Sequence, residues 1–438
     1  MAQESLSSKI LASNNIEPTV HPSFPTNKTV YLDHSVEETI PCKIYPETTD
    51  LANGSPLEFV IHECAEQYLD LSSLKLEVKL RLLNAAGGRA DINNDTEVYF
   101  TNNLLSSLFP ICKVFINNTN VESQYYNHHI ANLNHIMEVP ISLSDNRGLP
   151  SGMFSTSDAK QAAATIVQET CENNELRKTF TKQEIILLKG FLNCDIASSN
   201  KFMIDGVNLR ILLEAAKPSQ IINAKDNAVA FLYEILSARL LVDRIKPTKS
   251  GFLNVSKYMQ NHSMEYIFKQ NIVHSELIAI GQNSLTIHRP FNSKIPSLLH
   301  IFFVEQLAEQ GIYNKDRLWY GTQELSSYRI TINGRVLTED EVDPRSGYMS
   351  PYVDSLIANG CPETFINASL YNRGSFVLSV KTNSSQPEEL MYETSGNLSI
   401  HLNFRNNLPS TVICFVVGVC HSSLEISPDR HCLTNFGY

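Results

Sequence analysis

Alternation of apolar and charged side chains is the strongest local pattern in this sequence. Residues 74–82 and 398–405 alternate without a break, as strands do when one face is buried and the other is solvated. Residues 328–332 alternate as far as Asn333-Gly334, a pair that favours a two-residue hairpin because both residues tolerate positive φ. The sequence therefore predicts a mainly β protein. Further strands are expected at 28–32, 56–62, 184–193, 202–213, 231–245, 272–280, 298–304, 375–381 and 411–420.

Helical patterns are fewer and fall between the predicted strands. Residues 127–138 and 157–172 are the strongest, and the second begins with a Ser-Asp cap followed by Ala-rich helix formers. Residues 252–268 are ambiguous between helix and strand. We therefore expect an all-β protein with helices inserted in its loops.

The order of these patterns repeats along the chain. Ile116 ends a strand before an Asn-Asn turn, and Ile332 ends a strand before Asn-Gly, 216 residues later. Gly206 and Gly396 precede a second matching pair of strands and are 190 residues apart. The separation between matching positions thus shrinks from 216 to 190 residues. The first copy must therefore contain extra residues after its hairpin, where both helix candidates lie.

The repeat predicts two consecutive eight-stranded sandwiches. Two units of this size fit the length of 438 residues. We expect an N-terminal arm at 1–24 and a first sandwich at 25–246, with a helical insertion near 127–172. The second sandwich is expected at 247–428, followed by a C-terminal tail at 429–438.

Composition narrows the possible functions. The net charge of −11 argues against binding nucleic acid through a general basic surface. The N-terminus lacks the apolar stretch of a signal peptide, and the longest apolar run, residues 412–419, is too short to span a membrane. Nine cysteines occur without a C-x-x-C pair, so we expect reduced thiols and synthesis inside a cell.

Histidines cluster at one place. His135 and Glu138 are spaced i, i+3 on a predicted helix face, as some metal sites require. The neighbouring His128 and His129 are expected to point apart, and no second cluster has ligand spacing. The prediction is a helix with polar side chains and no metal site.

A Cys/His nucleophile is conceivable at His62-Glu63-Cys64. A nucleophile must lie within hydrogen-bond reach of its base, and three consecutive residues alone do not establish that geometry. The sequence also lacks G-x-S-x-G, H-E-x-x-H and P-loop patterns. We therefore predict no catalytic, cofactor-binding or metal-binding residues, and no enzyme activity.

Aromatic residues gather around the single tryptophan, Trp319, with Tyr313 and Tyr320 nearby in sequence. Such a group can stack on a carbohydrate, which leaves a lectin-like protein as an alternative. A position in the core or in an interface is the stronger expectation.

Ordered blocks along residues 25–435 resemble the double jelly-roll major capsid proteins of Polinton/Maverick elements and adintoviruses. The family patterns P-[IL]-E-F, Y-[IL]-D-L and G-V-[DN]-L-R-[IL] match Pro56–Phe59, Tyr68–Leu71 and Gly206–Ile211. The hairpin 113–123 and the stretch 396–430 match two further blocks. The insertion from 138 to 177 departs from the pattern and leaves the lineage open.

This resemblance implies two jelly-roll sandwiches and a structural role. Such proteins form homotrimers that act as pseudo-hexameric capsomers in the icosahedral shell of a double-stranded DNA virus. Neighbouring capsomers and a penton or minor capsid protein are then the partners, and the shell encloses DNA without reading its sequence. The expected location is the virion capsid. The alternatives are a double-sandwich enzyme, such as a glycan-directed hydrolase or copper monooxygenase, and a lectin-like protein.

Overall fold

The computed structural model describes residues 35–47, 55–90, 98–139, 148–154, 172–199, 201–224, 230–360, 367–382 and 394–435. The predicted strand at 28–32, the predicted arm at 1–24 and all but the last residue of the predicted helix at 157–172 lie outside these ranges.

The first unit consists of two four-stranded antiparallel sheets. The order in one sheet is β1 (Val36–Ile44), β10 (Phe231–Pro247), β3 (Tyr68–Asn84) and β7 (Ile186–Phe191). The order in the other is β2 (Leu57–Ile61), β8 (Leu209–Glu214), β5 (Ile111–Ile116) and β6 (Thr119–Gln124).

The second unit repeats this arrangement with the next set of strands. One sheet runs β11 (Met264–Ile278), β20 (Val412–Ile426), β14 (Leu298–Glu305) and β17 (Leu378–Lys381), and β21 (Cys432–Asn435) pairs with β20. The other runs β12 (Ser284–His288), β19 (Leu398–Phe404), β15 (Leu325–Ile332) and β16 (Arg335–Glu341). In both units the eight main strands, counted along the chain, pair in the orders 1-8-3-6 and 2-7-4-5, so each unit is a jelly roll.

Short elements connect these strands. Two small sheets pair β4 (Val98–Phe100) with β9 (Ile222–Ala224) and β13 (Lys294–Ile295) with β18 (Thr394–Ser395). The helices and 3₁₀ turns of the first unit are α2 (Leu104–Ser107), α3 (Asn127–Glu138), η1 (Leu149–Ser151), α5 (Glu172–Thr181), η2 (Asp195–Ser198) and α6 (Pro218–Ile221). Those that follow are α7 (Lys249–Met259), α8 (Gln306–Gln310), η3 (Pro344–Ser346), α9 (Met349–Asn359) and α10 (Ala368–Asn372).

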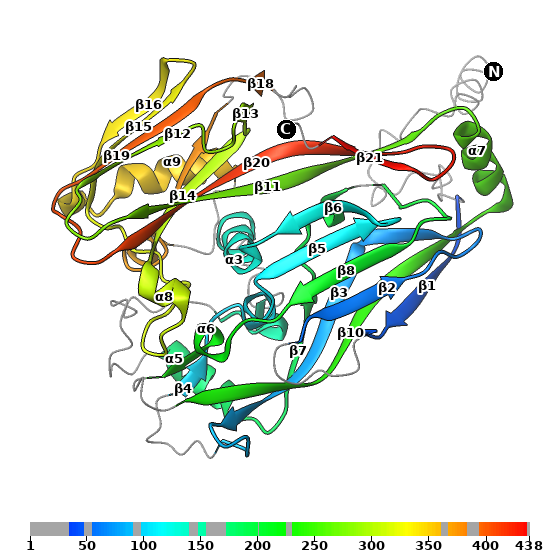
Figure 1. Cartoon of the computed structure of the whole chain (residues 1–438), viewed down its shortest axis with the longest axis horizontal. Coiled ribbons are helices and arrows are strands. Elements are labelled where there is room, and N and C mark those ends of the chain that lie inside the picture. The colour runs from blue at the N-terminus through cyan, green and yellow to red at the C-terminus, as the bar shows by residue number, and fades with distance from the viewer. Residues whose placement is uncertain are drawn as a thin grey trace, which may run out of the picture.

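Each unit has a hydrophobic core, and each core includes residues of the other unit. The first core contains Tyr266, Phe268, Leu424 and Ile426 at the far ends of β11 and β20. The second contains Leu133, Ile136 and Met137 of α3. Figure 1 shows the long strands β11 and β20 reaching over the first unit, and α3 between the two sheet systems. Burying these residues in the neighbouring core links the two units by the hydrophobic effect.

The strongest sequence patterns fold as predicted. The alternating residues 74–82 lie in β3, where every second side chain from Leu74 to Leu82 is buried. The hairpin of β15 and β16 turns at Asn333 and Gly334, both with positive φ. Asn117 and Asn118 make the matching turn between β5 and β6.

Several predicted boundaries are wrong. The strand predicted at 202–213 begins at Leu209, and the one predicted at 272–280 begins at Met264. The ambiguous segment 252–268 contains most of α7 and the start of β11. Strand β1 was missed because its sequence does not alternate and contains Pro41, which an edge strand tolerates. Part of the predicted tail forms β21.

The helical insertion is not unique to the first unit. The connection between the fifth and sixth strands spans residues 125–185 in the first unit and 342–377 in the second. The second connection contains α9 and α10, which the sequence analysis did not predict. The first connection is longer, in agreement with the shrinking separation between matching positions of the two copies.

Two further expectations concern membranes and thiols. Within the described residues no helix is both long and apolar enough to cross a membrane. Seven of the nine cysteines belong to the described part of the chain, and none of these seven forms a disulfide.

Candidate functional site: the buried junction between the two jelly rolls

Helix α3 is buried on both sides because it lies between the units. Nine of its twelve residues are buried, two of them asparagine and two histidine. On one side, the Asn127 backbone N–H donates to the Pro110 carbonyl oxygen at 2.9 Å, within the first unit. On the other side, the His129 ring lies 4.8 Å from the Phe415 ring and 5.3 Å from the Phe302 ring, centroid to centroid. The buried polar residues of α3 therefore need partners inside the protein.

His128 and His129 find a shared partner in Glu309 of α8. His129 Nε2 lies 3.0 Å from one carboxylate oxygen of Glu309, and His128 Nε2 lies 3.5 Å from the other. The two imidazole centroids are 4.0 Å apart. The prediction that these histidines point apart is wrong, because both turn toward Glu309.

Arg317 supplies the positive charge at this junction. Its Nη2 donates to Glu309 at 2.9 Å and to His128 Nε2 at 2.6 Å, and its side chain is almost fully buried. His128 Nε2 is therefore an acceptor, and the ring is neutral. Burial, reinforced by the Arg317 charge, holds the pKa of His128 well below its ordinary value. Burial also lowers the pKa of His129, although Glu309 opposes the shift.

Glu309 remains ionised despite its burial. Burial alone would raise the pKa of Glu309, but Arg317 together with His129 and His128 outweighs this effect and holds the pKa well below its ordinary value. The junction thus contains one buried ion pair, Arg317–Glu309, with two neutral imidazoles as hydrogen-bond partners. Such a pair must be complete, because removing one member leaves an uncompensated buried charge.

Tyr320 completes the network from the second unit. Its hydroxyl lies 3.0 Å from His129 Nδ1 and accepts from Asn132 Nδ2 at 3.1 Å. The consistent arrangement has Tyr320 donating to His129 Nδ1, while His129 Nε2–H donates to Glu309. Tyr320 is fully buried, and the expectation of a core or interface position is confirmed for this residue.

The three residues His128, His129 and Glu309 also meet the donor and distance requirements of a metal site, since their ligand atoms lie within 4.8 Å of one another. Two imidazoles and a carboxylate suit zinc. In this arrangement, however, Arg317 already donates to two of the three residues. A divalent cation would have to displace a buried guanidinium, so the residues present fit the arginine better than a metal ion.

A second buried polar cluster joins η2 of the first unit to β11. The two carboxylate oxygens of Asp195 accept from the backbone N–H and the side-chain amide of Asn271, at 3.0 and 2.7 Å. Glu122 accepts from the backbone N–H groups of Asp195 and Ile196 at 2.8 and 3.1 Å. Burial raises the pKa of Asp195 to about 6, and burial together with the Asp195 charge raises the pKa of Glu122. The sequence did not mark these carboxylates.

Two ion pairs among the described residues cross between the units. Arg177 of α5 reaches Asp316 at 3.6 Å. Arg430, in the turn before β21, donates to Asp205 of the first unit at 2.9 Å. The polar contacts between the units are therefore spread along the whole junction.

The remaining sequence candidates lie apart from this network. Burial lowers the pKa of His135 to about 4, whereas Glu138 is exposed at the end of α3. Tyr313 contacts the backbone of Phe231. Trp319 is partly exposed, and its indole N–H donates to the Arg373 carbonyl oxygen at 3.2 Å. Tyr313, Trp319 and Tyr320 thus have separate partners and do not form a stacking platform.

His62, Glu63 and Cys64 lie in the loop after β2 and not in a strand. The His62 carbonyl oxygen accepts from Arg244 at 2.7 Å, and the Glu63 backbone N–H donates to Asn208 at 2.9 Å. These contacts involve the backbone and hold the loop against its neighbours.

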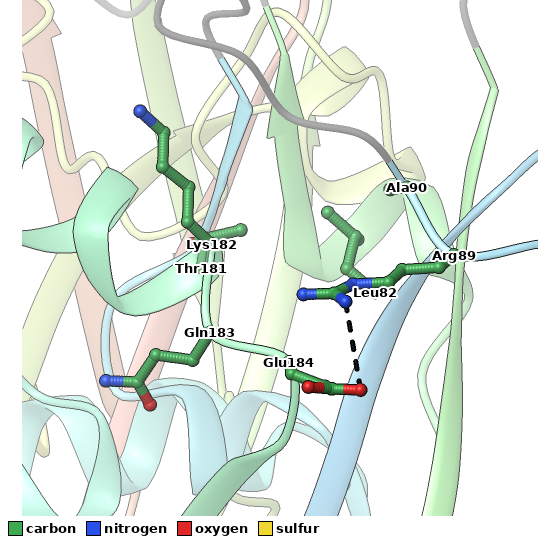
Figure 2. Close-up of a pocket in the computed structure, with 7 residues that line it drawn as sticks. All are labelled: Leu82, Arg89, Ala90, Thr181, Lys182, Gln183 and Glu184. Carbon is green, nitrogen blue, oxygen red and sulfur yellow. Dashed lines mark ion pairs between the residues drawn. The ribbon is translucent and has the colours of Figure 1, made fainter.

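A surface hollow of about 490 Å³ lies at one end of the first unit. Its lining residues are Leu82, Arg89, Ala90, Thr181, Lys182, Gln183 and Glu184. Figure 2 shows the ion pair across it, in which Arg89 lies 3.7 Å from Glu184. Both side chains are well exposed, and the lining contains no histidine or cysteine. The hollow therefore brings together no Cys/His pair.

Comparisons with known proteins agree with this architecture. No protein-family model and no curated protein matches the sequence. A chain of the Sputnik virophage structure matches with a TM-score of 0.63 at 13% identity, over 97% of this chain and 93% of that one. The Faustovirus major capsid protein matches with a TM-score of 0.56 at 10% identity, over 97% of this chain and 98% of that one. The mavirus major capsid protein matches with a TM-score of 0.54 at 10% identity, over 96% of each chain.

These matches cover almost the whole chain. Because the sequence identities are low, they establish the fold alone. The predicted all-β double jelly roll with helices in its loops is confirmed. The Polinton or adintovirus lineage stays a prediction.

Proposed function

We propose that this chain is the major capsid protein of a double-stranded DNA virus or virus-like element of the Polinton and adintovirus kind. In this proposal it forms homotrimers whose six jelly rolls make a pseudo-hexameric capsomer of an icosahedral shell. The units correspond to residues 25–246 and 247–428, and the role is structural and not enzymatic.

The observation that carries this proposal is the pair of jelly rolls with the same strand order, held together by shared cores and by the hydrogen bonds of the buried Arg317–Glu309 pair to α3. A building block of a shell must present two sandwiches in a fixed relative position, because each lattice contact depends on it. The junction supplies that rigidity: apolar burial contributes most of the free energy, and the polar network fixes the orientation. The match to major capsid proteins over nearly the full chain supports the same function.

Partners follow from this role. Neighbouring capsomers and a penton or minor capsid protein would contact the outer edges of the trimer. The genome would be enclosed without sequence-specific contact, in line with a net charge of −11. The location would be the virion capsid.

The experiment is to express the whole chain and measure its mass by light scattering after size exclusion. A trimer has three times the chain mass of 49.2 kDa. Electron micrographs of the same material should contain hexagonal capsomers or closed shells. A monomer at every concentration, with no assembly on concentration, would contradict the proposal.

A further inference from the structure

Helix α9 exposes a stripe of apolar side chains that faces away from its own unit. Met349, Val353 and Ile357 are spaced by four residues and are 49%, 45% and 71% exposed. Ser355, which is buried, marks the opposite side of the helix. At 3.6 residues per turn, Val353 and Ile357 lie roughly 160° around the helix from Ser355. A continuous apolar stripe of this kind indicates a contact surface.

The buried side of α9 is fixed to its own sheet. Ser355 Oγ donates to the Val377 carbonyl oxygen at 3.0 Å and accepts from the Ser379 backbone N–H at 2.9 Å. The exposed stripe therefore does not arise from a loosely attached helix.

The first unit shows what covers a helix in this position. α3 and α9 are each the first α-helix of the connection between the fifth and sixth strands of their unit. α3 packs on its own unit with one side and on the second unit with the other, where His129 contacts Phe302 and Phe415. Both phenylalanines lie on the outward face of the β14–β20 pair, since their neighbour Phe303 packs inward on Phe404.

The equivalent outward face in the first unit is formed by β3, β10 and β7, and it has no cover within the described chain. Leu187 and Phe191 of β7 are 51% and 57% exposed there. They pair with Lys79 and Lys75 of β3, and Lys75 Nζ lies 5.0 Å over the Phe191 ring. Lys189 pairs with Glu77 between them. This face combines apolar side chains with an excess of positive charge.

The surroundings of α9 carry the opposite charge. Asp354 is exposed on the helix beside the stripe. Asp340, at the C-terminal end of β16, accepts from Ser350 Oγ at 3.0 Å. Burial, together with the nearby Asp340 charge, raises the pKa of Asp354. Copies of a chain with a net charge of −11 repel one another on average. Specific association therefore needs locally complementary charge, such as the acidic surroundings of α9 against the basic face of β3 and β7.

We propose that the stripe Met349–Val353–Ile357 of one copy packs on the outward face of β3 and β7, around Leu187 and Phe191, in the first unit of a second copy. The junction within a chain is then repeated between chains. The contact is head-to-tail and forms a closed ring when the rotation per copy allows it. This inference rests on the proposed function and identifies the surfaces that the trimer would use.

The test compares two double variants by sedimentation. Val353→Asp with Ile357→Asp places charge in the stripe, and Leu187→Asp with Phe191→Asp does so on the opposing face. All four side chains are exposed, so each variant should keep the circular dichroism spectrum of the folded wild type. We expect wild-type trimers of three times 49.2 kDa and monomers for both variants. The control Leu253→Asp on α7, 65% exposed and outside both surfaces, should remain trimeric.

Mixing the two variants tests the head-to-tail pairing. Each mixed pair retains one intact contact, the stripe of one chain against the β7 face of the other, so the mixture should form dimers and no trimers. A milder variant, Ile357→Ser, should raise the dissociation concentration of the trimer about ten-fold without adding a charge.

The outcomes separate the two proposals. Trimeric wild type together with trimeric double variants would overturn this interface and leave the proposed function standing. Monomeric variants whose mixture stays monomeric would overturn the head-to-tail pairing. A wild type that never associates would overturn both.

Discussion

Arg317→Met removes the positive charge beside a buried carboxylate, that of Glu309, and tests whether the polar junction stabilises the fold. The Arg317 and Glu309 side chains are 2% and 13% exposed. Methionine keeps much of the length of arginine and leaves Glu309 with neutral partners. Breaking a buried pair in this way costs about 3–5 kcal/mol. That is a large part of the roughly 5–15 kcal/mol by which folded proteins are stable.

The free energy of unfolding in urea is measured with the fluorescence of Trp319 as the probe of unfolding. This residue is the only tryptophan in the chain, and it is two positions from Arg317. The matched control is Arg81→Met, which breaks an ion pair with Glu234 at 2.6 Å whose side chains are 44% and 30% exposed. Because exposed pairs contribute about 0–1 kcal/mol, the control should change stability little.

A double variant separates charge from packing. Adding Glu309→Gln to Arg317→Met removes the stranded charge, so the double variant should recover part of the lost stability. If Arg317→Met costs no more than Arg81→Met, or if Glu309→Gln brings no recovery, the buried ion pair does not stabilise the junction as described.

Three further predictions follow from individual contacts. Zinc should raise the melting temperature of Arg317→Met and not that of the wild type, because the substitution frees two imidazoles and a carboxylate; equal shifts would contradict this account. The pKa of Asp195 is raised from 3.8 to about 6, so its contribution is complete below pH 3.8 and is lost as the pH rises through 6. This raised pKa should cost the wild type about 2 kcal/mol of stability between pH 4 and 7, and the loss should be smaller in Asp195→Asn, measured by urea unfolding at both values; parallel pH profiles would refute it. Gly418→Ala should destabilise the second unit by about 1–3 kcal/mol, because an added Cβ would lie 2.8 Å from Phe291; an unchanged melting temperature would show that this ring can move.

The sequence predicts the strands well where one face is solvated. Residues 74–82 alternate because the charged side of β3 lies on the outside of the unit. The turn at Asn333-Gly334 is also local, since its positive φ values depend on those two residues. Strand β1 has no such pattern, and its pairing with β10 involves residues about 200 positions away.

The junction itself could not be predicted from one sequence. Glu309 is 180 residues from His129, and no local pattern marks it as a partner. The expectation that His128 and His129 point apart assumed one solvated helix face, whereas α3 is enclosed by two units. A weak signal was present: a helix with asparagine and histidine on all sides needs hydrogen-bond partners on all sides. For His128, His129 and Asn132 these partners lie in the second jelly roll.

The most direct test of the central claim is the mass and shape of the purified full-length chain. Light scattering after size exclusion should give three times 49.2 kDa, and electron micrographs of the same fraction should show pseudo-hexagonal particles that pack into arrays or shells. A chain that remains a 49.2 kDa monomer across the accessible concentrations, with no ordered assembly in the images, would contradict a capsid function.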